Sequence, residues 1–511
     1  MSKAHSDLDP LRWKALIFIA LAQLMVVVDG TIVNIALPSA QEDLGISDGN
    51  RQWVITAYAL AFGGLLLFGG RVADLWGRRR AFIIGLIGFA AASALGGAAT
   101  NEAMLYASRA LQGVFGALAA PASLSLLTVL FTDAKERAKA FGIYGAIAGA
   151  GAAVGLLLGG TLTEYMDWRW TFFVNIPFAA VAAAGAVAVI REPESARNRS
   201  TLDMPGVVLA SLGLVALVYG FSRAEQEDWT EGVTISMFVA SVVLLGAFAV
   251  VESRVKSPLL PLRVVTDRNR GGAYLALGLA IIAMFGLFLF LTYYLQAVRD
   301  YSPVMAGVAF LPMVVGMITG STQIGTRLVT RVPPRYLMAP GFLVAALGML
   351  LLTQLSLDSS YWGIVMPAQL LLGLGMGTAF MPAMGVATEG VKPTDAGVAS
   401  AMVNVSQQVG GAIGVALLNT IAAGATTSYL TAHAAGVTSQ QDQLRLQLES
   451  MVHGYTEAIW WAFAIVVLSA VVSFVLINSK GHQGGPAAAG SGDGDGDAAL
   501  SDGQPVPVMA H

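Results

Sequence analysis

The 511-residue chain contains no cysteine and few charged residues. Without cysteine it can form neither disulfides nor metal sites with thiolate ligands. Charged residues make up 12% of the chain, whereas a typical soluble domain has about 25%. The net charge is −3, so there is no basic excess of the kind that binds nucleic acid. These absences exclude thiol chemistry and argue against a nucleic-acid partner.

Motifs for ATP and for metals are missing as well. The sequence has no G-x-x-x-x-G-K-[ST] segment, so the chain itself offers no phosphate-binding loop for ATP. The five histidines are scattered, and none lies in a long apolar stretch: His5, His433, His453, His482 and His511. We therefore expect no metal and no cofactor, with any work driven by a partner or by an ion gradient. A polytopic membrane enzyme would need acids or histidines clustered at a membrane boundary, and none are found.

Long apolar runs are what the chain has in abundance, with 56% of its residues hydrophobic. A helix needs about 20 apolar residues to cross the hydrocarbon core of a bilayer. In lipid, each crossing segment must satisfy its own backbone hydrogen bonds, so these runs are predicted as helices. Fourteen spans are expected: 15–38, 52–72, 81–100, 103–131, 138–163, 170–190, 204–222, 232–251, 271–298, 304–326, 336–355, 361–388, 396–424 and 457–478. The fold class is all-α integral membrane.

Positive residues give the orientation. If the N-terminus is cytoplasmic, 23 of the 29 Lys and Arg residues lie in inner segments, five lie in outer loops, and Arg109 lies within a helix. The positive-inside rule requires this asymmetry, and one missed or added span would destroy it. We therefore expect a multi-pass protein of the cytoplasmic membrane with both termini in the cytoplasm.

Asp29 is the only acid well inside a predicted span, which makes it the main candidate for proton coupling. Removal from water favours the neutral form of a carboxylic acid, whereas a nearby cation such as Arg109 favours the charged form. A proton and a cationic substrate that compete for one carboxylate form a minimal antiport mechanism. Two alternatives remain open: Asp29 bonds locally around Gly30, or Arg109 extends to the interface. Glu164 and Asp167 are poorer candidates because water reaches them.

The loop between the second and third spans reads GRVADLWGRRR, Gly70 to Arg80. It resembles the signature of the major facilitator superfamily, G-x-L-A-D-[RK]-x-G-[RK]-[RK]-[RK], although Val72 and Leu75 depart from it. The matching residues are Gly70, Asp74, Gly77, Arg78, Arg79 and Arg80. Glycines permit a tight turn there, and a carboxylate can face a helix N-terminus. The resemblance implies that Asp74 stabilises the outward-facing state against the start of the thirteenth span, near Gly397.

Two further segments resemble motifs of the same superfamily. LYASRALQGVFGA, Leu105 to Ala117, resembles its proton-coupling motif, with Arg109, Gln112 and Gly113 in register. GIYGAIAGAGAAVGLLLGG resembles the antiporter motif G-x(8)-G-x(3)-G-P-x(2)-G-G, which is found in exporters. The residues that match the latter are Gly142, Gly151, Gly155, Gly159 and Gly160. Glycines permit close helix contact and bending. Leu156 replaces the motif's proline, so we expect this helix to be straighter.

The first span carries VVVDGTIVNIALP, Val26 to Pro38. This resembles the motif of the fourteen-helix drug–proton antiporter family, the EmrB/QacA-type multidrug exporters. The resemblance covers roughly residues 13–478 and implies two six-helix bundles with two helices inserted between them. The expected parts are a cytoplasmic N-terminus 1–14, an N-terminal bundle 15–190, inserted helices 204–251, a C-terminal bundle 271–478 and a disordered tail 479–511. Within the last bundle, segment 425–456 is expected as an amphipathic hairpin lying on the outer face.

The expected function is proton-coupled efflux of amphipathic drugs or antibiotics by alternating access, performed by a monomer. A substrate cavity between the halves is predicted to be lined by Asp29, Asn34, Tyr58, Gln112, Tyr293, Tyr294, Gln296, Gln369, Asn404 and Gln407. Aromatic rings and one acid suit a lipophilic cation. The alternative is a dedicated exporter of one lipid, siderophore or endogenous metabolite. A channel would show repeated polar faces, and these are absent.

Overall fold

The computed structural model describes residues 10–47, 50, 53–191, 202–329, 331–434 and 439–478. The predicted disordered tail 479–511 lies outside the described residues. Every regular element in the described part is helical, and thirteen helical stretches there are long and apolar enough to cross a membrane. A further helix of 32 residues, Ala134–Tyr165, occupies the fifth predicted span. Helices therefore follow all fourteen predicted spans.

The N-terminal helices pack around a common core. They are α1 (Arg12–Leu44), α2 (Trp53–Trp76), α3 (Arg78–Gly97), α4 (Glu102–Leu130), α5 (Ala134–Tyr165), α6 (Trp170–Phe173) and α7 (Asn175–Val189). Asn101 caps α4, because its side-chain oxygen accepts a hydrogen bond from the backbone N–H of Met104. At the start of α1, Arg12 forms an ion pair with Glu136 of α5 at 2.7 Å, and this guanidinium holds the pKa of the Glu136 carboxyl below its usual range.

Glycines bring α5 against α1. A Cβ on Gly155 would lie 1.9 Å from Oγ1 of Thr31, and one on Gly151 would lie 2.7 Å from Val27, so only glycine fits at this spacing. Gly159 faces α1 in the same way, and Gly160 is buried. The antiporter-like motif therefore produces the close helix contact that its glycines predicted. The side chain of Leu156 lies outside the described residues.

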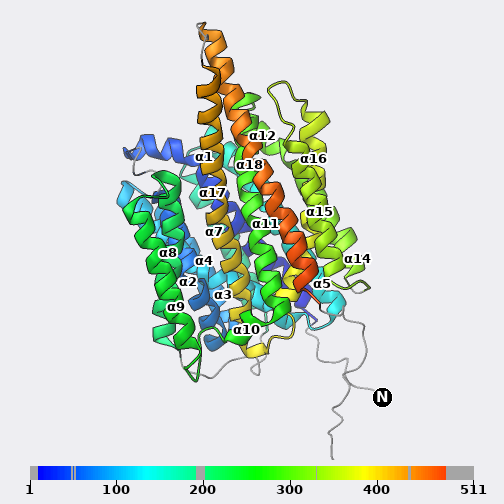
Figure 1. Ribbon diagram of the computed structural model, residues 1–511. Helices are drawn as coiled ribbons and strands as arrows, with labels where there is room; N and C mark the ends of the chain where they lie inside the picture. Colours follow the sequence, from blue (N-terminus) through cyan, green and yellow to red (C-terminus); the bar gives the residue numbers. More distant parts are fainter. Residues whose placement is uncertain are drawn as a thin grey trace, which may run out of the picture.

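Two helices lie between the bundles along the chain. They are α8 (Met204–Gln226) and α9 (Gly232–Glu252), followed by the short α10 (Leu262–Thr266). They pack against each other and stand at one edge of the molecule, where α8 also packs against α2 (Figure 1). The ring of Tyr219 on α8 stacks on Trp53 of α2, with ring centroids 6.1 Å apart. The pair also contacts the second group of helices, since α8 packs against the later helix Ala396–His433 and Trp229 donates to Thr420 at 2.8 Å.

The C-terminal helices form the second group. They are α11 (Arg268–Tyr293) with η2 (Tyr294–Val298), α12 (Pro303–Ala309), α13 (Leu311–Thr319), η3 (Gly320–Gly325), α14 (Thr326–Leu328), α15 (Arg335–Leu352), η4 (Tyr361–Val365), α16 (Met366–Thr388), η5 (Pro393–Asp395), α17 (Ala396–His433) and α18 (Gln440–Leu476). The predicted span 304–326 is divided into four pieces. Pro312 has no N–H to donate within the helix, and a π-helical turn follows at Gly320.

The outer segment 425–456 differs from its prediction. It does not lie flat, because α17 and α18 continue as regular helices of 38 and 37 residues and project beyond the other helices (Figure 1, orange). At 1.5 Å per residue such helices are about 55 Å long, well beyond the ~30 Å hydrocarbon core. Tyr429 stacks on His433 of its own helix and lies 4.7 Å from the ring of His453 on α18. These rings join the two helices above the bundle.

Candidate functional site

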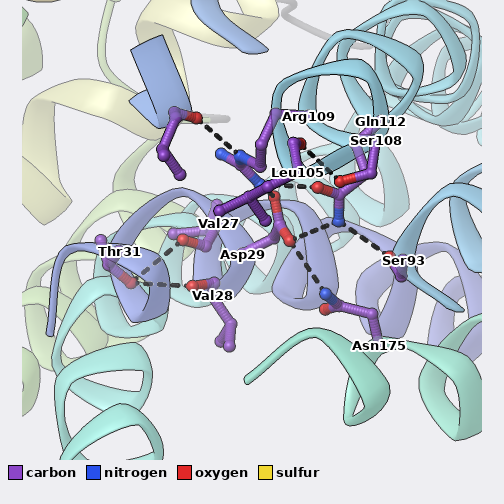
Figure 2. A network of polar contacts seen from close by, with 11 residues as sticks. Val27, Val28, Asp29, Thr31, Ser93, Leu105, Ser108, Arg109, Gln112 and Asn175 are labelled. Carbon is purple, nitrogen blue, oxygen red and sulfur yellow. Dashed lines mark hydrogen bonds and ion pairs between the residues drawn. The ribbon is translucent and has the colours of Figure 1, made fainter. Parts of the chain in front are cut away.

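A buried ion pair lies inside the N-terminal bundle, between α1 and α4. Arg109 donates a hydrogen bond to Oδ2 of Asp29 at 2.8 Å, and the two side chains are 2% and 0% exposed (Figure 2). The two residues are 80 positions apart in the sequence. The structure thus brings together both predicted proton-coupling residues. It also places Arg109 in the interior, so this side chain does not extend to the interface.

Two amides complete the surroundings of the carboxylate. Nε2 of Gln112 and Nδ2 of Asn175 each donate to Oδ1 of Asp29 at 2.9 Å (Figure 2). Gln112 also accepts from Arg109 at 2.8 Å and donates to Oγ of Ser93 at 2.8 Å. Helices α1, α3, α4 and α7 therefore meet at one polar cluster. Hydrogen bonds of this kind offset the cost of burying a charge.

The guanidinium of Arg109 has further partners. Its Nε donates to the backbone carbonyl of Val54 on α2 at 2.9 Å. The ring of Tyr58 lies 4.4 Å from the guanidinium carbon, within the range of a cation–π contact, and Phe172 lies at 6.0 Å on another side. Tyr58 is itself buried and stacks on Phe62. Of the predicted cavity residues, Tyr58 and Gln112 thus join the ion pair.

The other predicted cavity residues do not join this cluster in the structure. Tyr294 is buried and donates its hydroxyl to the carbonyl of Ser356 at 2.9 Å, whereas Tyr293 is half exposed. Asn404 donates to the carbonyl of Ser400 on its own helix. Gln296 and Gln407 are partly buried, and the side chain of Asn34 lies outside the described residues. Their role in substrate binding stays a prediction.

Sequence reasoning missed Asn175 and Ser93. Asn175 lies in the segment WRWTFFVNIP, Trp168 to Pro177, to which the sequence alone assigned no role. The available signal was its chemistry, since a polar amide inside the apolar span 170–190 needs a hydrogen-bonding partner. Ser93 gave no such signal, because a serine in a helix can bond to its own backbone.

The two bundles meet at the end of the molecule where α1 begins. Asp74 of α2 accepts hydrogen bonds from the backbone N–H groups of Gly397 and Val398, at 2.9 and 3.2 Å, at the start of α17. Arg78 pairs with the same carboxylate at 2.7 Å and donates to Ser125 of α4. A Cβ on Gly70 would lie 2.6 Å from the carbonyl of Gly397.

This contact uses the helix N-terminus, whose unpaired N–H groups carry partial positive charge and favour a carboxylate. Gly77 adopts φ of +100°, a conformation that side chains rarely take, so the turn between α2 and α3 requires glycine. The predicted contact of Asp74 near Gly397 is present. Its part in gating stays a prediction.

A second contact joins the bundles through α5. Oγ of Ser321 on η3 donates to the carbonyl of Gly142 at 2.6 Å, and a Cβ on Gly142 would lie 3.1 Å from Thr326. Hence Gly142, at the start of the antiporter-like motif, faces the other bundle, whereas Gly151 and Gly155 face α1. One motif therefore serves both an inter-bundle and an intra-bundle contact.

These features together define a class. Two groups of membrane-spanning helices meet through hydrogen bonds at one end, and one group holds a buried ion pair in its interior. Charges inside a membrane-spanning bundle are costly and typically mark an ion or substrate pathway. Two bundles that can rock against each other are the architecture of secondary transporters. The fold and the buried site are those of a multi-pass membrane transporter.

Comparison with known proteins gives the family. The chain belongs to the Major Facilitator Superfamily, whose family model matches residues 19–415. It is 54% identical over 481 residues to the "Puromycin resistance protein pur8" of Streptomyces alboniger, covering 94% of each chain. It is 38% identical to the "Cephamycin export protein CmcT" of Amycolatopsis lactamdurans, over 81% of this chain and 85% of that protein.

A solved structure has a similar fold. The human organic anion transporter MFSD10 (TETRAN) matches with a TM-score of 0.62 and 14% identity, over 89% of this chain and 100% of that one. At this identity the likeness concerns the fold alone.

Proposed function

We propose that the protein exports an antibiotic or a related amphipathic small molecule across the cytoplasmic membrane in exchange for protons. The observation that carries the proposal is the buried Asp29–Arg109 ion pair, with its two amides, inside one bundle of a two-bundle transporter. Relatives named for antibiotic resistance and export support the direction of transport. The protein acts as a transporter and not as an enzyme, since the substrate leaves chemically unchanged.

Asp29 is the proposed proton carrier. In the charged state it pairs with Arg109 and accepts two amide hydrogen bonds. Protonation removes the charge that attracts Arg109, and the guanidinium then keeps the carbonyl of Val54 and the side chain of Gln112 as partners. A proton moving down the membrane potential supplies about 2.3 kcal/mol per 100 mV, which drives the cycle without a cofactor.

Alternating access follows from the contacts between bundles. The excess of Lys and Arg in alternate loops supports placing the start of α1, the turn at Gly77 and the C-terminus in the cytoplasm. In that orientation the contact of Asp74 with α17 holds the cytoplasmic ends together. The reverse step, which admits substrate from the cytoplasm, requires Asp74 to leave the N–H groups of Gly397 and Val398.

The proposed substrates are lipophilic molecules, most of them cationic. Aromatic side chains such as Tyr58, beside the buried Asp29–Arg109 pair, suit a cation with apolar surface. A relative at 54% identity is named for resistance to puromycin, so puromycin is the first compound to test. That name, which specifies one antibiotic, also favours a second candidate function, the dedicated export of a single metabolite.

The proposal is tested in proteoliposomes that enclose a pH-sensitive dye. Puromycin and a panel of lipophilic cations are added to the wild type and to Asp29→Asn. We expect substrate-evoked proton movement in the wild type and its loss in Asp29→Asn, because the amide cannot carry a proton. The matched control is Asp43→Asn, the same change on the same helix, at an acid that is 44% exposed and pairs with Arg169 near the end of α1.

Each outcome separates the alternatives. Loss in Asp29→Asn with retention in Asp43→Asn supports antiport through Asp29. Proton movement that survives in Asp29→Asn assigns the proton to another group and overturns the role of Asp29. Proton movement with puromycin alone, and with no other cation of the panel, identifies a dedicated exporter.

A further inference from the structure

The two amides that contact Asp29 differ in one respect. Both donate an N–H to the same carboxylate oxygen, Oδ1 of Asp29, at 2.9 Å. An amide has an oxygen that accepts and a nitrogen that donates, and its orientation follows from the hydrogen bonds around it. The two amides differ in the contacts that hold each one in the orientation seen in Figure 2.

Gln112 is held in one orientation. Its oxygen accepts from Arg109 at 2.8 Å, and its nitrogen donates to Ser93 as well as to Asp29. Turning this amide would place its nitrogen against a guanidinium, where two donors would face each other. Its orientation is therefore independent of the protonation of Asp29.

Among the described residues, only Asp29 forms a hydrogen bond with the side chain of Asn175. Asn175 is 0% exposed, and its side-chain oxygen has no hydrogen-bond partner among the described residues. An unpartnered buried carbonyl oxygen is unfavourable, so the charged carboxylate must be what keeps the nitrogen turned toward it. A turn of this amide breaks no other hydrogen bond of its own side chain. Asn175 is also the first residue of α7 and follows α6, which carries Phe172, after the single residue Val174.

Protonation changes the kind of hydrogen-bond partner that Oδ1 of Asp29 needs, from a donor to an acceptor. When a proton from water binds Oδ1, a new O–H bond forms and this atom becomes a donor that needs an acceptor. Gln112 can offer only its N–H groups, whereas Asn175 can turn and accept with its oxygen. Of the charged and titratable groups around Asp29, Arg109 of α4 forms the ion pair and Tyr58 of α2 lies over the guanidinium. In the described part of α5, α6 and α7 no side chain forms an ion pair with it.

We propose that Asn175 is a positioning residue that turns with the protonation of Asp29, donating to the carboxylate and accepting from the carboxylic acid. The inference rests on the proposed role of Asp29 as the proton carrier and adds a second participant. The turn reverses the direction of the hydrogen bond between Asp29 of α1 and Asn175 at the start of α7. The Gln112 amide of α4 keeps its orientation.

The test is pH-difference infrared spectroscopy of the purified full-length protein, without substrate. One sample carries ¹³C-labelled asparagine and a second carries ¹³C-labelled glutamine. The carboxyl band that appears on acidification and is absent in Asp29→Asn is assigned to Asp29. We expect an asparagine amide band that changes together with it, is lost in Asn175→Leu, and shifts more than any glutamine band, because the Gln112 amide keeps its orientation and its hydrogen bonds to Arg109 and Ser93.

Two variants separate a positioning role from a structural one. Asn175→Leu removes both donor and acceptor, so the Asp29 carboxyl band should shift to the higher frequency of an acid without an acceptor. Asn175→Ser, whose hydroxyl can donate or accept, should restore the band toward its wild-type frequency even if it lowers stability.

The outcomes distinguish this inference from the proposed function. An Asp29 carboxyl band without an asparagine change, or a band at the same frequency in Asn175→Leu, overturns the inference and leaves the proton role of Asp29 in place. The absence of an Asp29 band at every pH overturns both.

Discussion

The two bundles pack one pair of helices in the same way, but the polar residue beside that contact is charged in the first bundle and neutral in the second. Gly113 of α4 packs against the backbone of Tyr58 on α2, and Gly373 of α16 packs against the backbone of Met313 on α13 in the same manner. Four residues before each glycine stands a buried polar residue: Arg109 in the first bundle and Gln369 in the second. The positions correspond, but only the first bundle contains an ion pair there.

Gln369 is fully buried, and neither atom of its amide has a hydrogen-bond partner among the described residues. Arg109, by contrast, has an ionic partner, a carbonyl and an amide as partners. The difference teaches that close packing of these helices does not need the charges. The charges of the first bundle therefore call for a functional explanation, and the proposed proton coupling is one.

Two of the contacts between the bundles differ in the same way, although a third, the buried ion pair of Arg71 with Asp395 at 3.9 Å, takes its carboxylate from the second bundle. Asp74 binds the N-terminus of α17 with a carboxylate, whereas Ser321 binds the carbonyl of Gly142 with a neutral hydroxyl. Hydrogen bonds to charged groups are about twice as strong as neutral ones. The first bundle therefore supplies the stronger of these two contacts.

The largest effect on stability and transport is expected for Arg109→Gln, which places in the first bundle the residue type that Gln369 supplies in the second. This change leaves Asp29 buried without a cation, which should destabilise the protein by about 3–5 kcal/mol and abolish exchange. Thermal unfolding in detergent measures the stability. The double variant Asp29→Asn with Arg109→Gln should recover most of it, because no charge remains unpaired. Equal stability of Arg109→Gln and the wild type would show that the ion pair is not needed.

The same substitution, glutamine to leucine, should change the free energy of unfolding in opposite directions in the two bundles. Gln112→Leu removes three hydrogen bonds around Asp29 and should destabilise by about 1–3 kcal/mol, because buried groups lose their partners. Gln369→Leu removes an amide whose atoms have no partner in the described part of the chain, and should stabilise by about 1 kcal/mol. Both variants are compared by thermal unfolding in one detergent. Destabilisation by Gln369→Leu would reveal a partner for that amide, and with it a polar site in the second bundle.

The sequence alone was sufficient to predict the membrane-spanning helices and to find the charged residues inside them. Hydrophobic length predicted each span, because crossing the membrane is a local requirement on about 20 residues. Asp29 and Arg109 were found because a charge in an apolar span is conspicuous and needs a partner. The contact of Asp74 with the start of α17 came from the resemblance to the family and not from the residues alone.

Contacts that depend on distant elements were not predictable. Asn175 meets Asp29 across 146 residues, and an asparagine near the end of an apolar span does not reveal which helix it faces. The projecting hairpin was predicted to lie flat, because the amphipathic pattern of 440–456 does not distinguish contact with a membrane surface from contact with a neighbouring helix. In the structure, the ring of Tyr429 lies against those of His433 and His453 and so connects the two helices.

The smallest changes in free energy are expected for substitutions at the contacts between the bundles. Asp74→Asn keeps an acceptor but loses its charge, so it should weaken the contact with α17 by about 1–2 kcal/mol, while Ser321→Ala should weaken the other contact by about 0.5–1 kcal/mol. Because the chain has no cysteine, Trp76→Cys and Lys392→Cys can carry a pair of spin labels at this end without background.

Electron–electron distance measurements should show a longer-distance population that is larger in Asp74→Asn than in Ser321→Ala, and smallest in the labelled parent. Each kilocalorie per mole changes the ratio of the two populations about fivefold, so the two variants should be distinguishable. If Ser321→Ala opened this end as much as Asp74→Asn, the neutral contact would be as strong as the charged one. The asymmetry between the bundles would then be confined to the buried ion pair.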